Sequence, residues 1–294
     1  MAEFECRGLT ASWLDSWLAA AGATVLDDRI RLHWSDDAAP VAVLSAVGQQ
    51  DPLDLLVESW PSKELITDMP IAADWQECSE MGRKVPVETF VERCQLARAH
   101  PLSWTLSSTV TDLVVYESGE VAHAPLDPKG PGTVGSLHHR LSRLLDSAED
   151  PANGLRESLR GAGQRVVNNG LGFDLTRVAS LADKTQNLVD PFLEAMAFFG
   201  LALFVVRGAG VDQRLGRRSL PARQRCWSRD HFMTWPSWSV PLDRHGLDAL
   251  LDVWTMRDIA FAKELGVTGA FRSVDYQERG SADTTVGFGS EHLW

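Results

Sequence analysis

The chain has 294 residues, of which 44% are apolar, and it carries a formal net charge of −12 at pH 7. A chain of this length can bury a substantial core, either as one large domain or as two smaller ones. Its longest apolar run, residues 195–206, is too short to span a bilayer. We therefore expect no membrane association, and because no apolar run follows the first residues we expect a cytoplasmic protein.

The first third of the chain predicts one helix and two strands. Thr10 is the expected N-cap of a helix with an indole-rich face formed by Trp13 and Trp17, and Gly22 is expected to end it. Alternation of apolar and polar residues predicts a strand at 30–34, and a second strand is expected at 41–47.

The middle of the chain contains the clearest break in the sequence. A helix is expected at 87–99, followed by a hairpin with arms at 110–116 and 120–126. Residues 127–135 contain two prolines and three glycines, and we interpret them as a boundary loop. It would separate an N-terminal α+β region, 1–127, from a C-terminal one, 136–294, although a single domain remains an alternative.

In the second half, leucine spacing predicts a helix at 137–145, whereas 156–169 is polar and has no clear assignment. Asp190-Pro191 is a typical helix start, so a helix is expected to run to Gly200 and to be followed by a buried strand at 201–206. A Pro/Trp passage, a helical region beginning at Leu247 and an extended or loose C-terminus complete the chain. The expected fold class is α+β, with mixed helices and short antiparallel hairpins in an irregular architecture.

Seven arginines lie in one stretch of 23 residues, 207–229, whose only acid is Asp212. The stretch therefore carries about +6, and the other 271 residues carry about −18. Guanidinium groups are forked, permanently charged donors that suit phosphate and carboxylate. Their concentration in an acidic chain favours a polyanion or an acidic protein surface as the partner, although surface ion pairs with the chain's own acids are an alternative.

The candidate nucleic-acid-binding residues are these arginines, a lysine in the boundary loop and three tryptophans in or near the segment. The tryptophans could either stack on unpaired bases or pack in the core. The full set is Arg207, Arg214, Arg217, Arg218, Arg223, Arg225, Arg229, Lys129, Trp227, Trp235 and Trp238.

Motifs that would indicate catalysis or a cofactor are missing from the sequence. Gly208-Ala-Gly210 follows an expected strand but lacks the third glycine of a dinucleotide-binding turn, and no P-loop occurs. Cys6, Cys78, Cys94 and Cys226 are widely separated, which argues against a zinc site and a disulfide framework. We therefore expect no catalytic residues, no metal and no cofactor.

Several stretches together resemble the CRISPR-associated large-subunit-like proteins of type I-U (I-G) systems. They are Gly8-Leu-Thr with the helix that follows, Asp127-Pro-Lys-Gly-Pro-Gly-Thr, Gly172-Phe-Asp174, Asp190-Pro-x-x-Glu194 with Gly200 to Arg207, and Trp238 to Leu242. The resemblance covers about half of the chain, in scattered patches whose order along the chain is its best support.

The resemblance implies a non-catalytic subunit of a crRNA-guided surveillance complex. Its expected partners are the crRNA-containing ribonucleoprotein subunits, target DNA and a helicase-nuclease. Two other interpretations stay open, namely a protein–protein adaptor whose arginines dock on acidic partner surfaces, and an enzyme acting on a small molecule or nucleotide.

Overall fold

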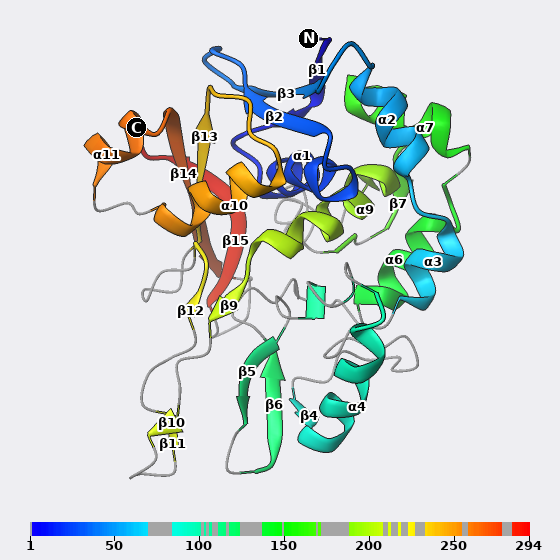
Figure 1. The fold of residues 1–294 in the computed structure, drawn as a ribbon, viewed down its shortest axis with the longest axis vertical. Helices are drawn as coiled ribbons and strands as arrows, with labels where there is room; N and C mark the ends of the chain where they lie inside the picture. Colours follow the sequence, from blue (N-terminus) through cyan, green and yellow to red (C-terminus); the bar gives the residue numbers. More distant parts are fainter. Residues whose placement is uncertain are drawn as a thin grey trace.

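The computed structural model has helices and short antiparallel sheets in irregular order, which confirms the α+β class (Figure 1). The described residues are 2–69, 84–100, 103, 106–107, 111–115, 118–123, 137–148, 150–168, 170–171, 188–207, 211–212, 217–218, 223–226, 233–254, 258–277 and 284–294. The predicted boundary loop, 127–135, lies outside them.

The N-terminal sheet has the strand order β1-β3-β2, with all neighbours antiparallel. Its strands are β1 (Glu3–Thr10), β2 (Ile30–Trp34) and β3 (Val41–Ala46). The two predicted strands are confirmed, and β1 was not predicted. Leu32 and Leu44 face each other in the register and are fully buried, so one face of this sheet belongs to the core.

Helix α1 (Leu14–Leu26) packs against this sheet and against α9 (Pro191–Gly200). The prediction that α1 begins after Thr10 and ends at Gly22 was wrong, because Trp13 is the N-cap and the helix continues for another turn. Gly22 instead allows the backbones of α1 and α9 to approach each other closely. A Cβ atom there would lie 2.0 Å from the Met196 carbonyl oxygen, and one at Gly200 would lie 2.1 Å from the Leu18 carbonyl oxygen.

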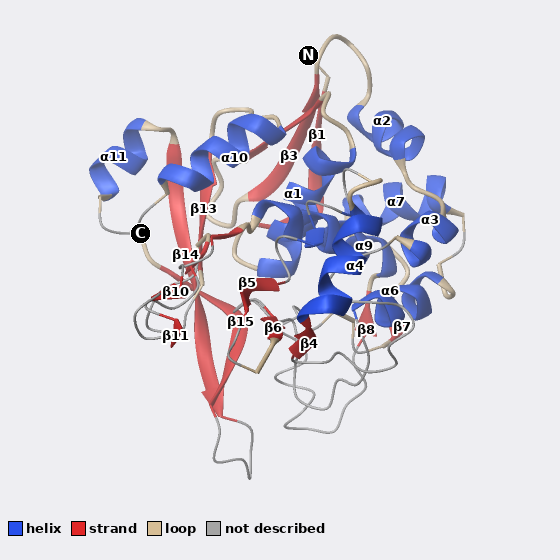
Figure 2. Ribbon diagram, turned by 60° about the horizontal axis from the view of Figure 1, so that its bottom comes forward, coloured by secondary structure: helices blue, strands red, loops and turns tan. Residues whose placement is uncertain are grey.

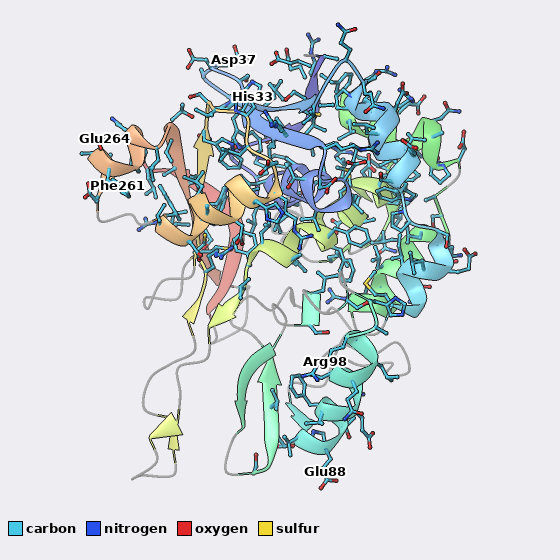
Figure 3. All side chains as sticks on the ribbon, in the orientation of Figure 1. His33, Asp37, Glu88, Arg98, Phe261 and Glu264 are labelled. Carbon is cyan, nitrogen blue, oxygen red and sulfur yellow. The ribbon has the colours of Figure 1, made fainter. Side chains whose placement is uncertain are left out.

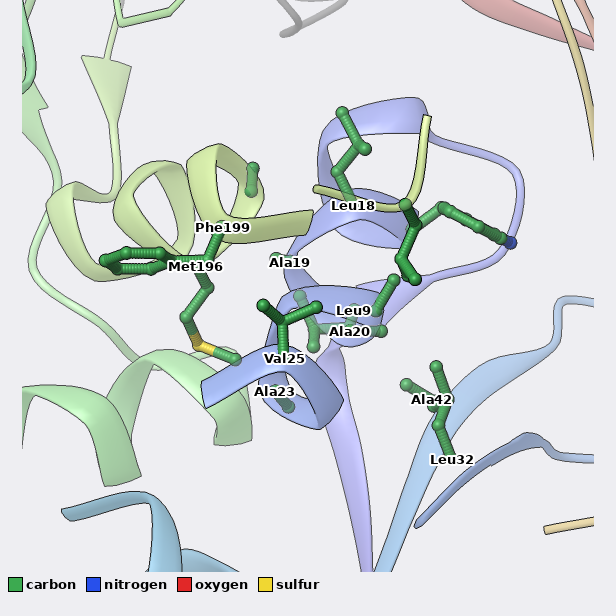
Figure 4. Close-up of a cluster of buried hydrophobic side chains, with 14 of the residues drawn as sticks. Leu9, Leu18, Ala19, Ala20, Ala23, Val25, Leu32, Ala42, Met196 and Phe199 are labelled. Atoms are coloured by element: carbon green, nitrogen blue, oxygen red, sulfur yellow. The ribbon is translucent and has the colours of Figure 1, made fainter. Parts of the chain in front are cut away.

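Buried hydrophobic side chains of α1 and α9 lie together in one cluster (Figure 4). Leu18, Ala19, Met196 and Phe199 are all fully buried there. The expected indole-rich face holds for one indole only, since Trp17 is fully buried but the Trp13 side chain is 37% exposed. The predicted cap of α9 is confirmed, because the Asp190 side chain accepts hydrogen bonds from two backbone N–H groups of its first turn.

Four further helices extend the helical side of the molecule beyond α9 (Figure 1). They are α2 (Pro52–Ser59), α3 (Lys63–Asp68), α6 (Leu137–Leu145) and α7 (Pro151–Arg160). Only α6 was predicted. Helix α7 extends into residues 156–169, a stretch without a clear assignment from the sequence. Both of its ends carry typical signals, since the Asp150 side chain caps its first turn and Gly161 ends it with φ +82°.

A small sheet and one helix lie at the lower end of the molecule in Figure 1. The strand order is β4-β6-β5, with β4 (Lys84–Pro86), β5 (Thr111–Val115) and β6 (Glu120–His123), and α4 (Val87–Ala97) follows β4 directly. The predicted hairpin and helix are therefore confirmed.

The C-terminal sheet has the order β13-β14-β15, and β14 and β15 form a long ribbon (Figure 2). Its strands are β13 (Thr234–Trp238), β14 (Val267–Gln277) and β15 (Thr284–His292), with helices α10 (Arg244–Val253) and α11 (Ile259–Glu264) between the first two. The C-terminus is thus extended as expected, but it is paired in a sheet.

The buried strand expected at 201–206 was largely wrong. Leu201–Leu203 forms a 3₁₀ turn that continues from α9, and only Val206–Arg207 is extended, as β9. This turn places the Phe204 ring 5.5 Å from the Trp17 ring, centroid to centroid, inside the core.

Three buried indoles connect the N-terminal part of the chain to β13. Trp17 Nε1 donates to the Pro236 carbonyl oxygen at 2.8 Å, Trp235 Nε1 to Ala11 at 2.8 Å and Trp238 Nε1 to Leu32 at 2.9 Å. Residues on both sides of the predicted boundary therefore contribute to one buried cluster. Among the described helices, none is long and apolar enough to cross a membrane.

Candidate nucleic-acid interface

The arginine segment forms a two-stranded antiparallel arm in its described parts. At its base, β9 (Val206–Arg207) pairs with β12 (Arg223–Gln224), and farther along β10 (Val211–Asp212) pairs with β11 (Arg217–Arg218). The second pair lies farther from the helical body than the first (Figure 1). The described residues of the segment therefore pair in short ladders.

Arg225 fixes the base of the arm to helix α10. Its side chain is only 7% exposed, and Nη1 donates to the Leu203 carbonyl oxygen at 2.8 Å and to Asp248 Oδ1 at 2.5 Å. Nη2 donates to Asp252 Oδ1 at 2.7 Å. The backbone is held as well, since Arg225 N–H donates to the Val205 carbonyl oxygen at 3.1 Å.

The charge of Arg225 is matched by its surroundings. Burial alone would lower the pKa of this guanidinium, but the hydrogen bonds and negative charges of Asp248 and Asp252 raise it above its ordinary value. The group therefore stays protonated and is occupied within the chain. As a result, Arg225 positions the arm, and the prediction that it binds nucleic acid directly is not supported by its burial.

The residue after Arg225 has a left-handed backbone conformation. Cys226 has φ +66°, and its carbonyl oxygen accepts the Thr234 N–H at 2.9 Å. Burial raises the pKa of its thiol to about 12, so the thiol stays protonated at neutral pH.

The other predicted arginines divide into two groups. Arg207, Arg217, Arg218 and Arg223 lie in the arm ladders, where Arg207 is opposite Arg223 and Arg217 is opposite Asp212. The second group, Arg214 and Arg229, lies outside the described residues. The same is true of two other predicted binding residues, Trp227 and Lys129. The structure thus brings four of the seven arginines into one paired arm and places a fifth at its base.

Two predicted base-stacking residues are core residues. Trp235 and Trp238 are fully buried, and both indole N–H groups are used in hydrogen bonds within the chain. The Trp235 ring stacks on Phe271, and the Trp238 ring packs edge-on against Trp34. Their inclusion among the nucleic-acid-binding residues was wrong, because neither ring has a face open to a base.

Sequence reasoning missed the acidic pair that holds the arm. Asp248 and Asp252 are four residues apart on α10, a spacing that places two side chains on one face of a helix. Their carboxylates are 49% and 39% exposed, so they bind Arg225 at the protein surface. The spacing was visible in the sequence, but nothing there indicated which arginine would meet it.

Two of the stretches that carry the family resemblance, the one that begins at Gly8 and the one that begins at Asp190, meet at a second place. A depression of about 210 Å³ is lined by residues from the end of β1, the start of α1 and the start of α9. Its lining includes Gly8, Thr10, Trp13, Asp190 and Glu194.

The carboxylates of this depression are already engaged within the chain. Asp190 caps α9 and accepts a hydrogen bond from Ser158 Oγ at 2.9 Å, and Glu194 accepts the Leu171 N–H at 2.7 Å. Burial raises the pKa of Asp190 despite these hydrogen bonds. The depression therefore reflects how α1 and α9 are packed and capped.

Within the described part of the chain, no group of three or more His, Cys, Asp or Glu side chains could hold a metal ion. Comparison of the chain with protein-family models, curated proteins and solved structures finds no match. The arm and its anchor are therefore the features on which a functional proposal can be built.

Proposed function

We propose that this chain is a non-catalytic, nucleic-acid-engaging protein whose arginine arm contacts the phosphate backbone. The observation that carries the proposal is the arm itself, a paired, arginine-rich projection from an otherwise acidic protein. The residues outside the segment carry about −18 in total, so they would repel a polyanion overall while the arm attracts it, and this charge distribution would also orient the bound strand.

The anchor supports this proposal. Arg225 ties the base of the arm to α10 through two hydrogen bonds, to Asp248 and Asp252, and a third joins it to the Leu203 carbonyl oxygen. The other arginines of the segment carry charge that its single acid cannot balance. Phosphate binding would bring such guanidinium groups the counter-charge that the segment does not provide.

The resemblance to type I-U (I-G) large-subunit-like proteins narrows the proposal. It favours a role in a crRNA-guided surveillance complex, where base pairing reads the sequence and protein subunits hold the backbones. Co-expression with the genomic neighbours, followed by affinity purification of this chain, tests that part. Recovery of other protein subunits together with a short RNA would support it, and recovery of the chain alone would contradict it.

The binding part is tested by removing charge from the arm. Arg217→Gln together with Arg218→Gln should weaken duplex DNA binding, and the log–log salt slope should fall by about 0.9 for each phosphate that is no longer neutralised. The matched control is the double variant Arg7→Gln with Arg143→Gln, which removes the same amount of charge. Both arginines are exposed and are remote from the arm in sequence. Equal weakening in both variants would mean that net charge, not the arm, governs binding.

A protein–protein adaptor is the second candidate, and two observations favour it. Arg225 is an arginine of this segment that already docks on an acidic helix face. Helix α11 also projects from the body with Ile259 and Phe261 at least 40% exposed (Figure 3). If the arm variant kept its DNA affinity and salt slope but no longer bound a protein partner, the adaptor role would replace the nucleic-acid role.

A further inference from the structure

Exposed apolar side chains gather at the depression between the starts of α1 and α9. Trp13 and Leu188 line it and are 37% and 46% exposed. Leu188 belongs to β8 (Leu188–Val189), which pairs with β7 (Val166–Val167) (Figure 2). In this ladder Leu188 lies opposite Val167, which is 59% exposed, and directly opposed residues have their side chains on the same face. Val167 therefore extends the apolar surface outward from the depression, and grouped apolar side chains of this kind mark interaction sites.

Trp13 is suited to contact with a protein partner. It is the N-cap of α1, and its backbone there is extended rather than helical. Within the part of the chain that the structure describes, its indole N–H has no hydrogen-bond partner. Tryptophan is enriched at protein interfaces because it combines a large apolar ring with one donor, and its ring face also attracts cations.

The charged residues that line the depression are mainly acidic. They are the carboxylates of Asp15, Asp190 and Glu194 and the guanidinium of Arg165. All three hydrogen bonds that Asp190 accepts in the described part of the chain end on Oδ1. Its capping of α9 therefore leaves Oδ2 as a further acceptor. Three negative groups against one positive group favour a cationic guest over an anionic one.

Arg165 would compete with such a guest. Its exposed side chain lines the depression. Burial raises the pKa of Asp190, and the positive charge of Arg165 acts in the opposite direction and lowers it. The charge of Arg165 therefore reaches the carboxylates of the depression, and a second cation placed there would be repelled by it.

We infer that this depression is a docking site for one basic side chain, Lys or Arg, which a partner protein presents between apolar neighbours. The alkyl stem packs on Trp13 and Leu188, the charged end faces the carboxylates, and the apolar neighbours cover Val167. The volume of about 210 Å³ is below the roughly 300–1,000 Å³ of pockets that hold drug-sized ligands, so it fits one long side chain. This inference is independent of the proposed function, which concerns the arginine arm.

The probes for the test are three acetylated and amidated tripeptides with leucine at both ends and arginine, citrulline or glutamate in the middle. Citrulline keeps the shape of arginine without its charge. Binding to the intact, isotope-labelled protein is followed through the indole N–H resonances, and Trp13→Phe identifies that of Trp13. We expect the arginine peptide to shift this resonance and to bind about tenfold more tightly than the citrulline peptide, since a charge pair and a cation–π contact are lost together. The glutamate peptide should bind most weakly.

Two variants with matched controls test the charges of the depression. Arg165→Gln should tighten binding of the arginine peptide by about two- to fivefold, because it removes a like charge, and a gain in affinity cannot come from a loss of fold. Arg143→Gln, which removes an exposed arginine of α6, should leave the affinity unchanged. Asp15→Asn should weaken binding by a similar factor, whereas Asp37→Asn in the β2–β3 turn should not (Figure 3).

Several results would overturn the inference. Equal affinity for the arginine and citrulline peptides, or tighter binding of the glutamate peptide, would exclude a site for a basic side chain. An arginine peptide that left the Trp13 resonance unmoved, or an Arg165→Gln variant without a gain in affinity, would exclude this depression. If the molar mass in sedimentation rose with concentration for the unmodified protein but not for Trp13→Ala, the occupant would be a second copy of the chain instead of another protein. DNA binding by the arm is unaffected by any of these results.

Discussion

Alanine in place of Gly22 should destabilise the protein, although alanine is the better helix former. In α1, the substitution would gain about 1 kcal/mol of helix propensity. The added Cβ atom, however, would lie 2.0 Å from the Met196 carbonyl oxygen and 2.9 Å from its carbonyl carbon. The first distance is about 1.4 Å short of ordinary contact, and both neighbours are backbone atoms of a buried helix that cannot rotate away.

Relief of this clash would require α1 and α9 to separate along an interface lined by fully buried side chains. Overpacking of a core costs about 1–3 kcal/mol and sometimes more, and the upper end applies where backbone is opposed to backbone. After the gain in propensity, we expect a net destabilisation of about 2 kcal/mol. For a chain of this size that corresponds to a melting temperature lower by about 3 °C.

Thermal and urea unfolding followed by circular dichroism would measure the effect, with Gly246→Ala in α10 as the control. At Gly246 the nearest atom to an added Cβ is the Leu242 Cδ2 methyl, 3.2 Å away at the end of a flexible side chain. This control should be neutral or slightly stabilising. If Gly22→Ala melted at or above the temperature of the unmodified protein, the close helix crossing would be refuted.

Three further predictions concern other parts of the fold. Trp17→Ala should lower the free energy of unfolding by about 3–5 kcal/mol, because it removes a fully buried ring. Trp13→Ala should lower it much less, and an equal loss in the two variants would contradict the assigned burial. The pKa of Asp190 is raised by burial, so its contribution to stability is fully present below its unfolded pKa and is lost as the pH rises through its folded pKa. Asp190→Asn keeps an equivalent cap and should flatten that part of the pH–stability curve, which a pH series of urea melts would detect. Arg225→Met should release the base of the arm from Asp248, so limited proteolysis should cut near residue 225 faster while the melting temperature changes less than in Trp17→Ala.

Local signals in the sequence predicted the elements whose ends and periodicity are determined by near neighbours. Asp190-Pro191 marks a helix start by backbone chemistry alone, and the alternation in 30–34 already identifies the buried face of a strand. Strand β1 carries the same alternation, with Cys6 buried and Glu5 exposed, and that signal was available but missed. Helix α7 was missed although Asp150 and Gly161 mark its two ends.

The candidate site was predictable as a region but not residue by residue. Seven arginines with one side-chain chemistry cannot be ranked from sequence, and the acids that single out Arg225 lie 23 and 27 positions away. Likewise, Trp235 is as suitable for a base as for a core until the strand that carries it is placed against the N-terminal segment. In both cases the deciding interaction is long-range, so no local pattern encodes it.

The three indole hydrogen bonds also determine when the protein can finish folding. They join positions that are 219, 224 and 206 residues apart in the chain. At a synthesis rate of roughly 5–20 residues per second, the N-terminal sheet and helix α1 would wait roughly 10–45 s for their partner strand to leave the ribosome. For most of that interval the apolar side of α1 has neither α9 nor β13 to cover it, because α9 is synthesised only shortly before β13. The nascent chain therefore presents a hydrophobic surface that a chaperone could bind and that would favour aggregation if left uncovered.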